Sequence, residues 1–398
     1  MPSLEIIKRR IPLQNRPLHP APYRGIIITA GDNLRLKEMN LNIKRRLHNI
    51  MVTGGAGFIG VNFIRNLLSN RKFSGRIVNV DALTYAGNTM SLPDVPEKHE
   101  GRYFFLKADI CDTERIYGIM KDFGIDTIIN FAAQSHVDRS IINPSDFVGT
   151  NIFGTFSLLE AARKSWKPGR GYLFHQVSTD EVYGTLGSEG SFSEASPYSP
   201  RSPYSASKAS ADLLAKAYYH TYGLPVTISN SSNNYGPYQF PEKLVPLMIN
   251  NMLERKPLPI YGDGKQVRDW IYVEDHVRGI WLILEKGIEG ESYNIGGGIE
   301  HENIRLVHLL CRLVAEETGA VEKDLRELII HVKDRPGHDR RYSMDCGKII
   351  RELGWQRRYT LKKGLAKTVK WYIDNTPWVE NVRNGEYLRW MDENYGNR

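Results

Sequence analysis

Short apolar runs alternate along the chain, from about His48 onward, with segments in which apolar residues recur every three or four positions. The short runs are rich in β-branched residues and predict strands, whereas the longer segments predict amphipathic helices. We expect strands at Asn49–Thr53, Arg76–Asp81, Tyr103–Leu106, Thr127–Phe131, Tyr172–Val177 and Val226–Ser229. Repeated strand-then-helix order is typical of a parallel sheet with helices on both faces. The predicted fold class is therefore α/β, a Rossmann-like doubly wound parallel sheet.

The pattern changes at about Ser231, where loops rich in Asn, Pro and Gly separate shorter elements. The elements expected here are a helix near Glu242–Glu254, strands at Leu258–Tyr261 and Ser292–Ile295, and helices at Asn303–Thr318 and Leu361–Asn375. We interpret this part as a smaller C-terminal α/β domain that covers the sheet. The predicted organisation is an N-terminal extension at 1–46, a Rossmann domain at 47–230 with a return segment near 268–287, and a second domain at 231–398.

The net charge of +8 on 398 residues suggests a nucleic-acid partner at first sight. Residues 1–50, however, hold 10 Lys and Arg against 3 Asp and Glu, so the rest of the chain carries only +1. A nearly neutral body lacks the basic face that nucleic-acid binding needs. No window approaches the 18 or so uninterrupted apolar residues of a membrane span. We therefore expect no nucleic acid and no membrane among the partners.

The extension at 1–46 contains several prolines and scattered arginines but no apolar core of a secretory signal. We interpret it as a disordered tail; a mitochondrial presequence and a true translation start at Met39 are the alternatives. The three cysteines, Cys111, Cys311 and Cys346, form no CxxC pair, which fits the reducing cytosol. The histidines show no ligand spacing such as HExxH, so we expect a cytoplasmic protein without a metal.

Three glycines, Gly54, Gly57 and Gly60, lie between the first expected strand and the first expected helix. A tight turn of glycines lets the backbone approach a pyrophosphate closely, and the following helix N-terminus offers free N–H groups and a partial positive charge. Glycine-rich turns are common, but this strand–turn–helix placement makes the pattern specific. The segment predicts a dinucleotide site.

Asp81 ends the second expected strand, 21 residues after Gly60. A carboxylate at this place accepts hydrogen bonds from a ribose diol and repels a 2′-phosphate, so NAD is favoured over NADP. Ligands of such sheets sit at the carboxyl ends of the strands. The third and fourth strands end in residues that we therefore expect beside the cofactor, namely Asp109, Ile110, Ala132, Ala133 and Ser135.

A Tyr-x-x-x-Lys pair places a phenol and an ammonium on one face of a helix, and the positive charge lowers the pKa of the phenol. The pattern occurs five times, so its context must decide. Only Tyr204 and Lys208 begin a long helical segment of small and apolar residues directly after a proline-rich loop. Ser178–Glu181 lies upstream at the end of the fifth strand, where it should face the same cleft.

Taken together, these motifs resemble the extended short-chain dehydrogenase/reductase superfamily, and within it the nucleotide-sugar dehydratases that act on dTDP-glucose. The resembling stretches are Met51–Gly60, Asp81–Asn88, Ala132–Ser140, Ser178–Gly184, Tyr204–Lys208, Ser232–Pro246, Gly262–Asp275 and Asp334–Asp339. They run through the body from about residue 48 to 345. The Thr-Asp-Glu triplet at 179–181 is the most specific of them, because it separates the dehydratases from epimerase relatives.

The resemblance implies a lyase that uses NAD without net redox change in deoxysugar (dTDP-rhamnose-type) biosynthesis. A nucleoside-diphosphate glucose is oxidised at C4, loses water across C5–C6 and regains the hydride at C6. Tyr204 would take the C4 hydroxyl proton, Lys208 would lower the pKa of the tyrosine, and Thr179 would hydrogen-bond the forming carbonyl. Glu181 would remove the C5 proton, and a protonated Asp180 would donate to the leaving C6 hydroxyl.

The resemblance also implies which residues surround the two ligands. The cofactor-binding residues are Gly54, Gly57, Phe58, Ile59, Gly60, Asp81, Ala82, Leu83, Thr84, Asp109, Ile110, Phe131, Ala132, Ala133, Ser135, Thr150, Tyr204, Lys208 and Asn234. The substrate-binding residues are Ser135, Thr179, Asn233, Lys243, Leu244, Pro259, Ile260, Tyr261, Arg268, Asn303, Asp334, Arg335, Pro336, Gly337 and His338. The second domain is thus expected to bind the nucleotide sugar.

Gln134 departs from the resembling family, which commonly carries Glu before Ser-His-Val-Asp-Arg; we expect tuning of the site rather than its loss. Another nucleotide-sugar 4,6-dehydratase, a 4-epimerase and a non-catalytic NAD-binding sensor stay open as alternatives. The acidic doublet argues against an epimerase, and the complete set of reactive residues argues against a sensor. The resemblance further implies a homodimer formed through helices near Ser145–Lys164 and Tyr204–Tyr222.

Overall fold

The computed structural model describes residue 45 and the ranges 47–167 and 171–383. Within these ranges the chain forms one compact unit. The predicted extension at 1–46 therefore lies outside the described residues, apart from Arg45, whose guanidinium donates to the carbonyl of Gly287. Within the described ranges, every helix is too short or too polar to span a bilayer.

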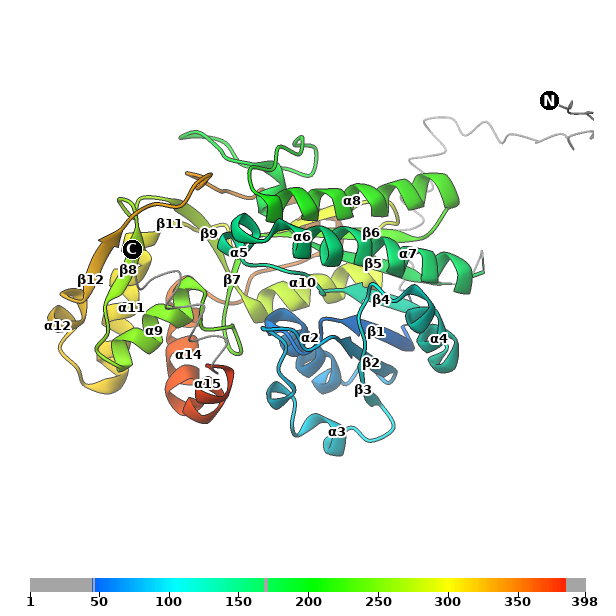
Figure 1. Cartoon of the computed structure of the whole chain (residues 1–398), viewed down its shortest axis with the longest axis horizontal. Coiled ribbons are helices and arrows are strands. Elements are labelled where there is room, and N and C mark those ends of the chain that lie inside the picture. Colours follow the sequence, from blue (N-terminus) through cyan, green and yellow to red (C-terminus); the bar gives the residue numbers. More distant parts are fainter. Residues whose placement is uncertain (1–44, 46, 168–170, 384–398) are drawn as a thin grey trace, which may run out of the picture. The chain divides into compact units, whose positions relative to one another are not determined.

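Seven parallel strands form the central sheet (Figure 1). They are β1 (Asn49–Thr53), β2 (Arg76–Asp81), β3 (Tyr103–Lys107), β4 (Thr127–Asn130), β5 (Leu173–Thr179), β6 (Val226–Ser231) and β10 (Ser292–Ile295). Their order across the sheet is β10-β6-β5-β4-β1-β2-β3. The chain reverses direction across the sheet between β1 and β4, and such a switch point is where ligands bind at the strand ends. The predicted fold class is confirmed.

Helices cover both faces of this sheet, because each strand buries side chains on both sides. Along β1, Ile50 and Val52 pack into one apolar cluster, which includes α2 (Phe58–Ser69) and α10 (Val273–Lys286). Met51 points into the opposite cluster. That cluster includes α4 (Thr113–Phe123), α7 (Gly154–Ser165) and α8 (Pro203–Tyr222). The shorter elements of this half are η1 (Thr89–Ser91), α3 (Val95–Lys98), α5 (Val137–Ile142), α6 (Pro144–Phe147), the π-helical η2 (Val148–Phe153) and η3 (Asp180–Tyr183).

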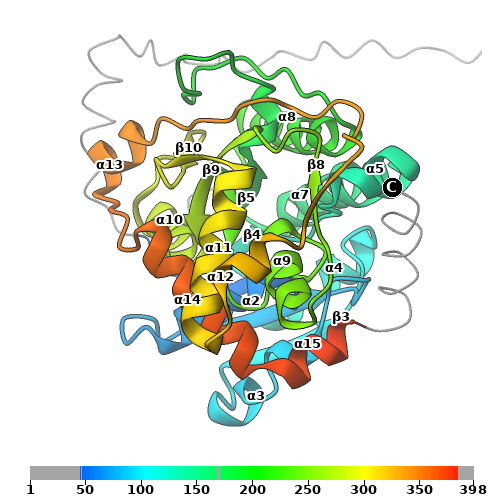
Figure 2. The same cartoon turned by 90° about the vertical axis from the view of Figure 1, so that its left-hand side faces the viewer.

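The remaining elements build a second apolar core, seen in front of the sheet in Figure 2. Two small sheets have the orders β11-β9-β7 and β12-β8. Their strands are β7 (Asn233–Tyr235), β8 (Leu258–Tyr261), β9 (Val267–Tyr272), β11 (Glu300–Glu302) and β12 (Ile329–Val332). The helices of this part are α9 (Leu244–Leu253), α11 (Asn303–Thr318), α12 (Glu322–Arg326), α14 (Leu361–Asp374) and α15 (Thr376–Val382). Helix α13 (Gly347–Leu353) instead packs into the first cluster, beside α10 and β10.

The structure differs from the sequence prediction in two ways that bear on the site. Ser292–Ile295, expected in the second domain, pairs with β6 at the edge of the large sheet, because α10 carries the chain back to it. The helix expected at Ser145–Lys164 is divided, with one π-helical segment between α6 and α7. A π-helical insertion rotates the side chains that follow it, and such insertions are frequent at functional sites.

Candidate active site

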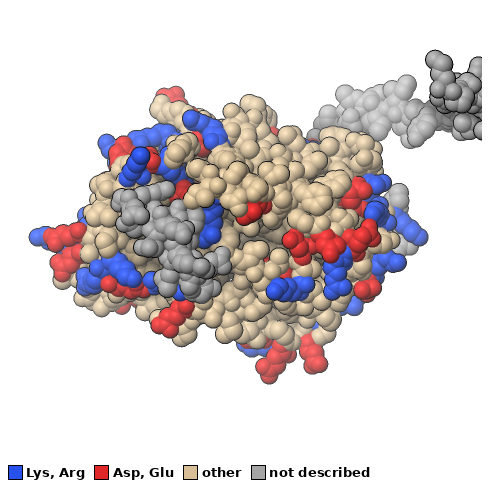
Figure 3. Space-filling model, in the orientation of Figure 1, with Lys and Arg blue, Asp and Glu red and all other residues tan. Residues whose placement is uncertain are grey.

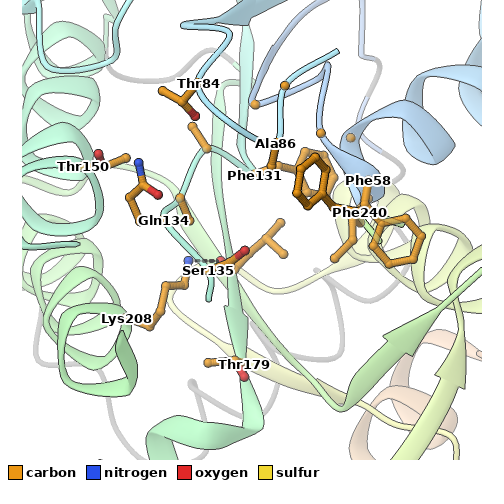
Figure 4. Close-up of a pocket in the computed structure, with 18 of the residues that line it drawn as sticks. Phe58, Thr84, Ala86, Phe131, Gln134, Ser135, Thr150, Thr179, Lys208 and Phe240 are labelled. Atoms are coloured by element: carbon orange, nitrogen blue, oxygen red, sulfur yellow. Dashed lines mark hydrogen bonds between the residues drawn. The ribbon is translucent and has the colours of Figure 1, made fainter. Parts of the chain in front are cut away.

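A cavity of about 310 Å³ lies at the carboxyl ends of β1, β2, β4 and β5. It is lined by the glycine turn after β1, by the end of β5 and by the first turns of α8. Figure 4 shows Lys208 reaching from its helix toward the middle of this cavity, where Ser135 lies, with the rings of Phe58, Phe131 and Phe240 on the other side. The structure thus brings the predicted cofactor cradle and the predicted reactive residues together.

The glycine turn has no room for side chains. Gly54 has a φ of +66°, and a Cβ added to it would lie 2.6 Å from the backbone nitrogen of Ala132. A Cβ on Gly60 would lie 2.4 Å from the carbonyl oxygen of Gly54. Helix α2 then begins at Phe58, and no side chain caps its N-terminus at Gly57. This uncapped helix end, placed behind a closely packed turn, fits the pyrophosphate of a dinucleotide.

Asp81 is fixed by the backbone at the end of β2. One carboxylate oxygen accepts from the N–H of Ala56 at 2.9 Å, and the other accepts from the N–H of Leu83 at 2.8 Å. Burial raises the pKa of Asp81, and these two hydrogen bonds oppose the rise. Each oxygen keeps a lone pair for a further donor. The carboxyl group can therefore accept from a ribose diol, which fits NAD.

Tyr204 and Lys208 lie on one face of α8 at its first turns. Ser202 caps this helix: its hydroxyl accepts from the N–H of Ser205, whose own hydroxyl accepts from the N–H of Ser202. Lys208 donates from Nζ to the carbonyl of Val177 at 2.7 Å. Burial lowers the pKa of Lys208 to about 8. Burial and the charge of Glu181 raise the pKa of Tyr204 well above its usual range.

The acidic doublet follows directly on the last residue of β5. Thr179 donates from its hydroxyl to Asp180 at 3.2 Å and accepts from the N–H of Glu181 at 3.3 Å. Burial raises the pKa of Asp180 well above its usual range, and the charges of Glu181 and Asp269 raise it further. The surroundings of Asp180 thus favour its protonated form.

Glu181 has positive groups around it. Burial raises its pKa, but the charges of Arg335, Lys243 and Arg268 oppose that rise. At Asp180, the guanidinium of Arg268 opposes the rise of the pKa, but the carboxylates of Glu181 and Asp269 add to it. The electrostatic surroundings thus favour a protonated Asp180 beside an ionised Glu181.

Most of the predicted site residues line the cavity, but a second group does not. The predicted residues outside the lining are Leu83, Leu244, Pro259, Ile260, Tyr261, Arg268, Asn303, Asp334, Arg335, Pro336, Gly337 and His338. Two of them are held by the carboxylate of Asp138. Tyr261 donates to Asp138 at 2.7 Å, and Arg335 pairs with the same carboxylate at 3.3 Å. Lys243, which does line the cavity, donates to the carbonyl of Ser135 at 2.8 Å.

Sequence reasoning missed a group of residues around Tyr85, of which Tyr85, Phe240 and Glu242 line the cavity. The guanidinium of Arg139 lies 4.1 Å from the centre of the Tyr85 ring and pairs at 3.2 Å with the buried carboxylate of Glu242. Phe240 meets Tyr85 edge to face at 5.6 Å. Each residue lies in a stretch that carries the family resemblance, which was the available signal. Gln134 also lines the cavity, and its backbone exchanges two hydrogen bonds with the side chain of Asn151.

The part of the chain that the structure describes contains no ready set of metal ligands. No group of three or more His, Cys, Asp or Glu side chains there could hold an ion. The three cysteines are free thiols. Two of them, Cys311 and Cys346, are buried in apolar clusters.

Comparison with known proteins agrees with this geometry. The family model described as GDP-mannose 4,6 dehydratase matches residues 51–368. A dTDP-glucose 4,6-dehydratase of Salmonella typhimurium is 50% identical over 363 residues, covering 88% of this chain and 99% of that protein. A structure of DesIV (dTDP-glucose 4,6-dehydratase) from Streptomyces venezuelae, with NAD and TYD bound, has a TM-score of 0.77 at 46% identity and covers 84% of this chain and 99% of its own.

A UDP-glucose 4-epimerase from Thermotoga maritima, solved with UDP-glucose, is also similar. It has a TM-score of 0.73 at 31% identity, covering 82% of this chain and 99% of its own. The dehydratases are therefore more similar in sequence than this epimerase, although the fold is shared. The predicted resemblance is confirmed, and the chain belongs to the GDP-mannose 4,6 dehydratase family.

Proposed function

We propose that the chain is an NAD-dependent dTDP-glucose 4,6-dehydratase of deoxysugar biosynthesis. It converts the nucleotide sugar to its 4-keto-6-deoxy form by oxidation at C4, elimination of water across C5–C6 and return of the hydride to C6. The observation that carries the proposal is the meeting of the Asp180–Glu181 doublet with Tyr204 and Lys208 in the cavity that the glycine turn closes. An epimerase, which breaks no C6–O bond, has no use for such a doublet.

Bound NAD supplies a reversible hydride acceptor with a positively charged ring. Tyr204 receives the proton of the C4 hydroxyl, and Lys208 places a positive charge on the same face of α8 so that a phenolate can form. Thr179 donates to the carbonyl oxygen that forms at C4. These residues act in a largely buried place, where each electrostatic contact counts for more than it does in water.

Elimination assigns opposite tasks to the doublet. Glu181 takes the C5 proton, which the C4 ketone has made acidic, while Asp180 gives its proton to the departing C6 hydroxyl. The positive groups Arg335, Lys243 and Arg268 support the charge of Glu181. The carboxylates near Asp180 oppose its ionisation. The C6 hydroxyl and the proton from Asp180 together leave as water.

The second apolar core serves the nucleotide end of the substrate. Arg335 and Arg268 suit the diphosphate, because a guanidinium makes two parallel bonds to such oxygens, and the Tyr261 ring offers a face to the base. We therefore assign 47–230 with its return segment to the cofactor and the part from 231 onward to the nucleotide sugar. Ser135 and Lys243 lie where the two halves meet, since Lys243 donates to the carbonyl of Ser135.

We also propose a homodimer in the cytoplasm. The face formed by α5 to α8 carries several apolar side chains that are more than half exposed, namely Ile142, Val148, Phe153, Leu213 and Tyr222. In Figure 3 the surface over α6 and α8 is largely free of charged groups. A contiguous apolar surface of this kind marks an association site. Light scattering should give twice the chain mass, and Leu213→Glu should give single chains; a monomeric wild type would contradict the proposal.

The experiment that tests the activity is incubation of the purified chain with dTDP-glucose, and separately with UDP-glucose and GDP-mannose. The 4-keto product is followed by its absorbance in alkali, and the sugar is identified by NMR. We expect a 4-keto-6-deoxy sugar, formed fastest from dTDP-glucose. Inversion at C4 with C6 still hydroxylated would identify an epimerase instead, and NAD binding without any turnover would indicate a sensor.

A further inference from the structure

A third polar side chain continues the line of Tyr204 and Lys208 along α8. Asp212 lies four residues after Lys208, on the same helix face, and its side chain is fully buried. A buried carboxylate is costly unless hydrogen bonds or an opposite charge compensate it. Asp212 lies outside the cavity lining, so contact with a ligand does not explain its presence.

One oxygen of Asp212 collects hydrogen bonds from three segments of the chain. Its Oδ2 accepts from the hydroxyl of Ser178 at 2.6 Å and from the phenol of Tyr198 at 3.0 Å. A longer contact of 3.4 Å comes from the amide of Asn230. Ser178 belongs to β5, Asn230 to β6 and Tyr198 to the loop before α8. The carboxylate therefore ties α8 to the ends of β5 and β6.

These contacts hold the strand end that carries Thr179. Lys208 binds the carbonyl of Val177 at 2.7 Å, and Asp212 binds the side chain of the next residue, Ser178. Asn230, which contacts Asp212, also donates to the carbonyl of Thr179 at 3.3 Å. Helix α8 thus holds two consecutive residues of β5 immediately before the hydroxyl and the acidic doublet that face the substrate.

The other oxygen of Asp212 is balanced by charge. Its Oδ1 is buried and accepts no hydrogen bond from any residue that the structure describes. Burial raises the pKa of Asp212 to about 6, and the positive charge of Lys208 opposes this rise. The effect is reciprocal, since burial lowers the pKa of Lys208 and the charge of Asp212 raises it. Each charge therefore favours the ionised form of the other group.

We propose that Asp212 is a positioning residue of the reaction: its charge keeps Lys208 protonated in a buried site, and its hydrogen bonds fix the end of β5 that carries Thr179. This inference rests on the proposed function, which gives Lys208 and Thr179 their tasks. The titratable groups that face Asp212 are Lys208 and Lys216 on α8, Tyr198 in the preceding loop and Tyr183 of η3. The strands β5 and β6 contribute the neutral side chains of Ser178 and Asn230.

The test is Asp212→Asn, which removes the charge and keeps a carbonyl oxygen for the three donors. Without the carboxylate, Lys208 loses its proton at lower pH. Because turnover needs the ammonium, the alkaline limb of the pH profile of kcat should move to lower pH by about one unit. The KM for dTDP-glucose should stay within about twofold. Tyr198→Phe is the matched control, because it removes one hydrogen bond to the same oxygen and leaves the charge; its alkaline limb should not move.

An alkaline limb of Asp212→Asn that coincides with that of the wild type would overturn the inference. Should this variant fail to fold, Asp212→Ser gives a second measurement, because a smaller neutral side chain also removes the charge and keeps an oxygen that can accept hydrogen bonds. Its alkaline limb should move in the same direction, and a limb at the wild-type pH would equally overturn the inference. A wild type without turnover on any nucleotide sugar would instead refute the proposed function.

Discussion

The two ends of the cavity are formed by different kinds of groups, backbone atoms at one end and charged side chains at the other. At the cofactor end, the walls are backbone: Gly54 and Gly60 pack against main-chain atoms, and Asp81 is held by two N–H groups. At the substrate end, long charged side chains beside the cavity bind one another, such as Arg335 with Asp138. Backbone walls cannot rearrange without moving strands, whereas ion pairs can exchange one partner for another.

This difference tells how each ligand is recognised. The cofactor end offers a fixed shape that suits a group which stays in place through the reaction cycle. At the substrate end, Arg335 and Tyr261 already have a partner in Asp138, and under the proposed function a diphosphate would compete with that carboxylate for the guanidinium. On this proposal, substrate affinity would be a difference between two sets of hydrogen bonds, and cofactor affinity would be set mainly by the shape of the turn.

The acidic doublet lies between the two ends, and Glu181→Gln should have the largest effect. The amide cannot take the C5 proton, so product formation should fall by about two to four orders of magnitude. Oxidation at C4 needs no base at position 181, so reduced NAD should accumulate on addition of dTDP-glucose. Stopped-flow absorbance of reduced NAD measures this directly.

The control for that experiment is Tyr204→Phe, which removes the proton acceptor of the first step. It should show an equal or larger loss of product, with NAD retained and no accumulation of its reduced form. Reduced NAD appearing in both variants alike would mean that the two residues do not act in successive steps. Rapid product formation by Glu181→Gln would contradict its assigned task.

Gly54→Ala probes the cofactor end. The added Cβ would meet the backbone of Ala132 in a conformation that L-residues avoid, at a cost of roughly 1–2 kcal/mol for the positive φ alone. We expect loss of bound NAD by at least about tenfold in affinity, measured on the purified protein by chromatography of the released nucleotide. Gly118→Ala is the matched control, because nothing lies within 4 Å of its Cβ on α4. It should retain NAD and gain about 0.5–1 kcal/mol of stability.

Arg335→Ala probes the substrate end. Loss of a charge-assisted contact to the diphosphate costs about 1.5–3 kcal/mol, so the KM for dTDP-glucose should rise about 10- to 100-fold. The NAD content should be unchanged, which separates the two ends. Lys362→Ala, an exposed cation on α14, should leave KM as it is. Equal changes of KM in the two variants would mean that Arg335 acts through the net charge of the protein and not through a specific contact.

The smallest expected effect is on the pH profile. Turnover needs an ionised Glu181, whose pKa is raised by burial, so activity should fall as pH drops through a value above the usual glutamate range. Arg335 lowers the pKa of Glu181, so its removal should move this acid limb to higher pH. The measurement is kcat against pH for both proteins. An acid limb at the same pH in both proteins would show that Arg335 does not influence the pKa of Glu181.

Much of the cofactor end could be predicted from sequence, because its determinants are local. The strands β1 and β2 have the predicted bounds, since each is a short apolar run beside a turn. The glycine spacing and the aspartate after β2 follow from the same short stretch. Strand β5 extends two residues beyond the prediction, to Thr179, because the polar Ser178 and Thr179 still pair with β6.

The substrate end could not be derived in the same way. Strand β9 was not predicted, because its pairing with β7 and β11 joins three distant segments of the chain. The pair of Arg139 with Glu242 joins positions 103 residues apart, and neither spacing nor hydrophobic pattern indicates such a pair. The different surroundings of Asp180 and Glu181 likewise depend on Arg335 and Lys243, which only the folded chain brings near.

Helix α8 turns two different faces to the molecule's interior and exterior. One face holds Tyr204 and Lys208 over the cavity, and the other presents Leu213 to solvent. In the proposed dimer, this one helix of 20 residues takes part in both subunit association and proton transfer. Specific activity should therefore decline on dilution as the subunits part, at concentrations where each chain by itself still holds its fold.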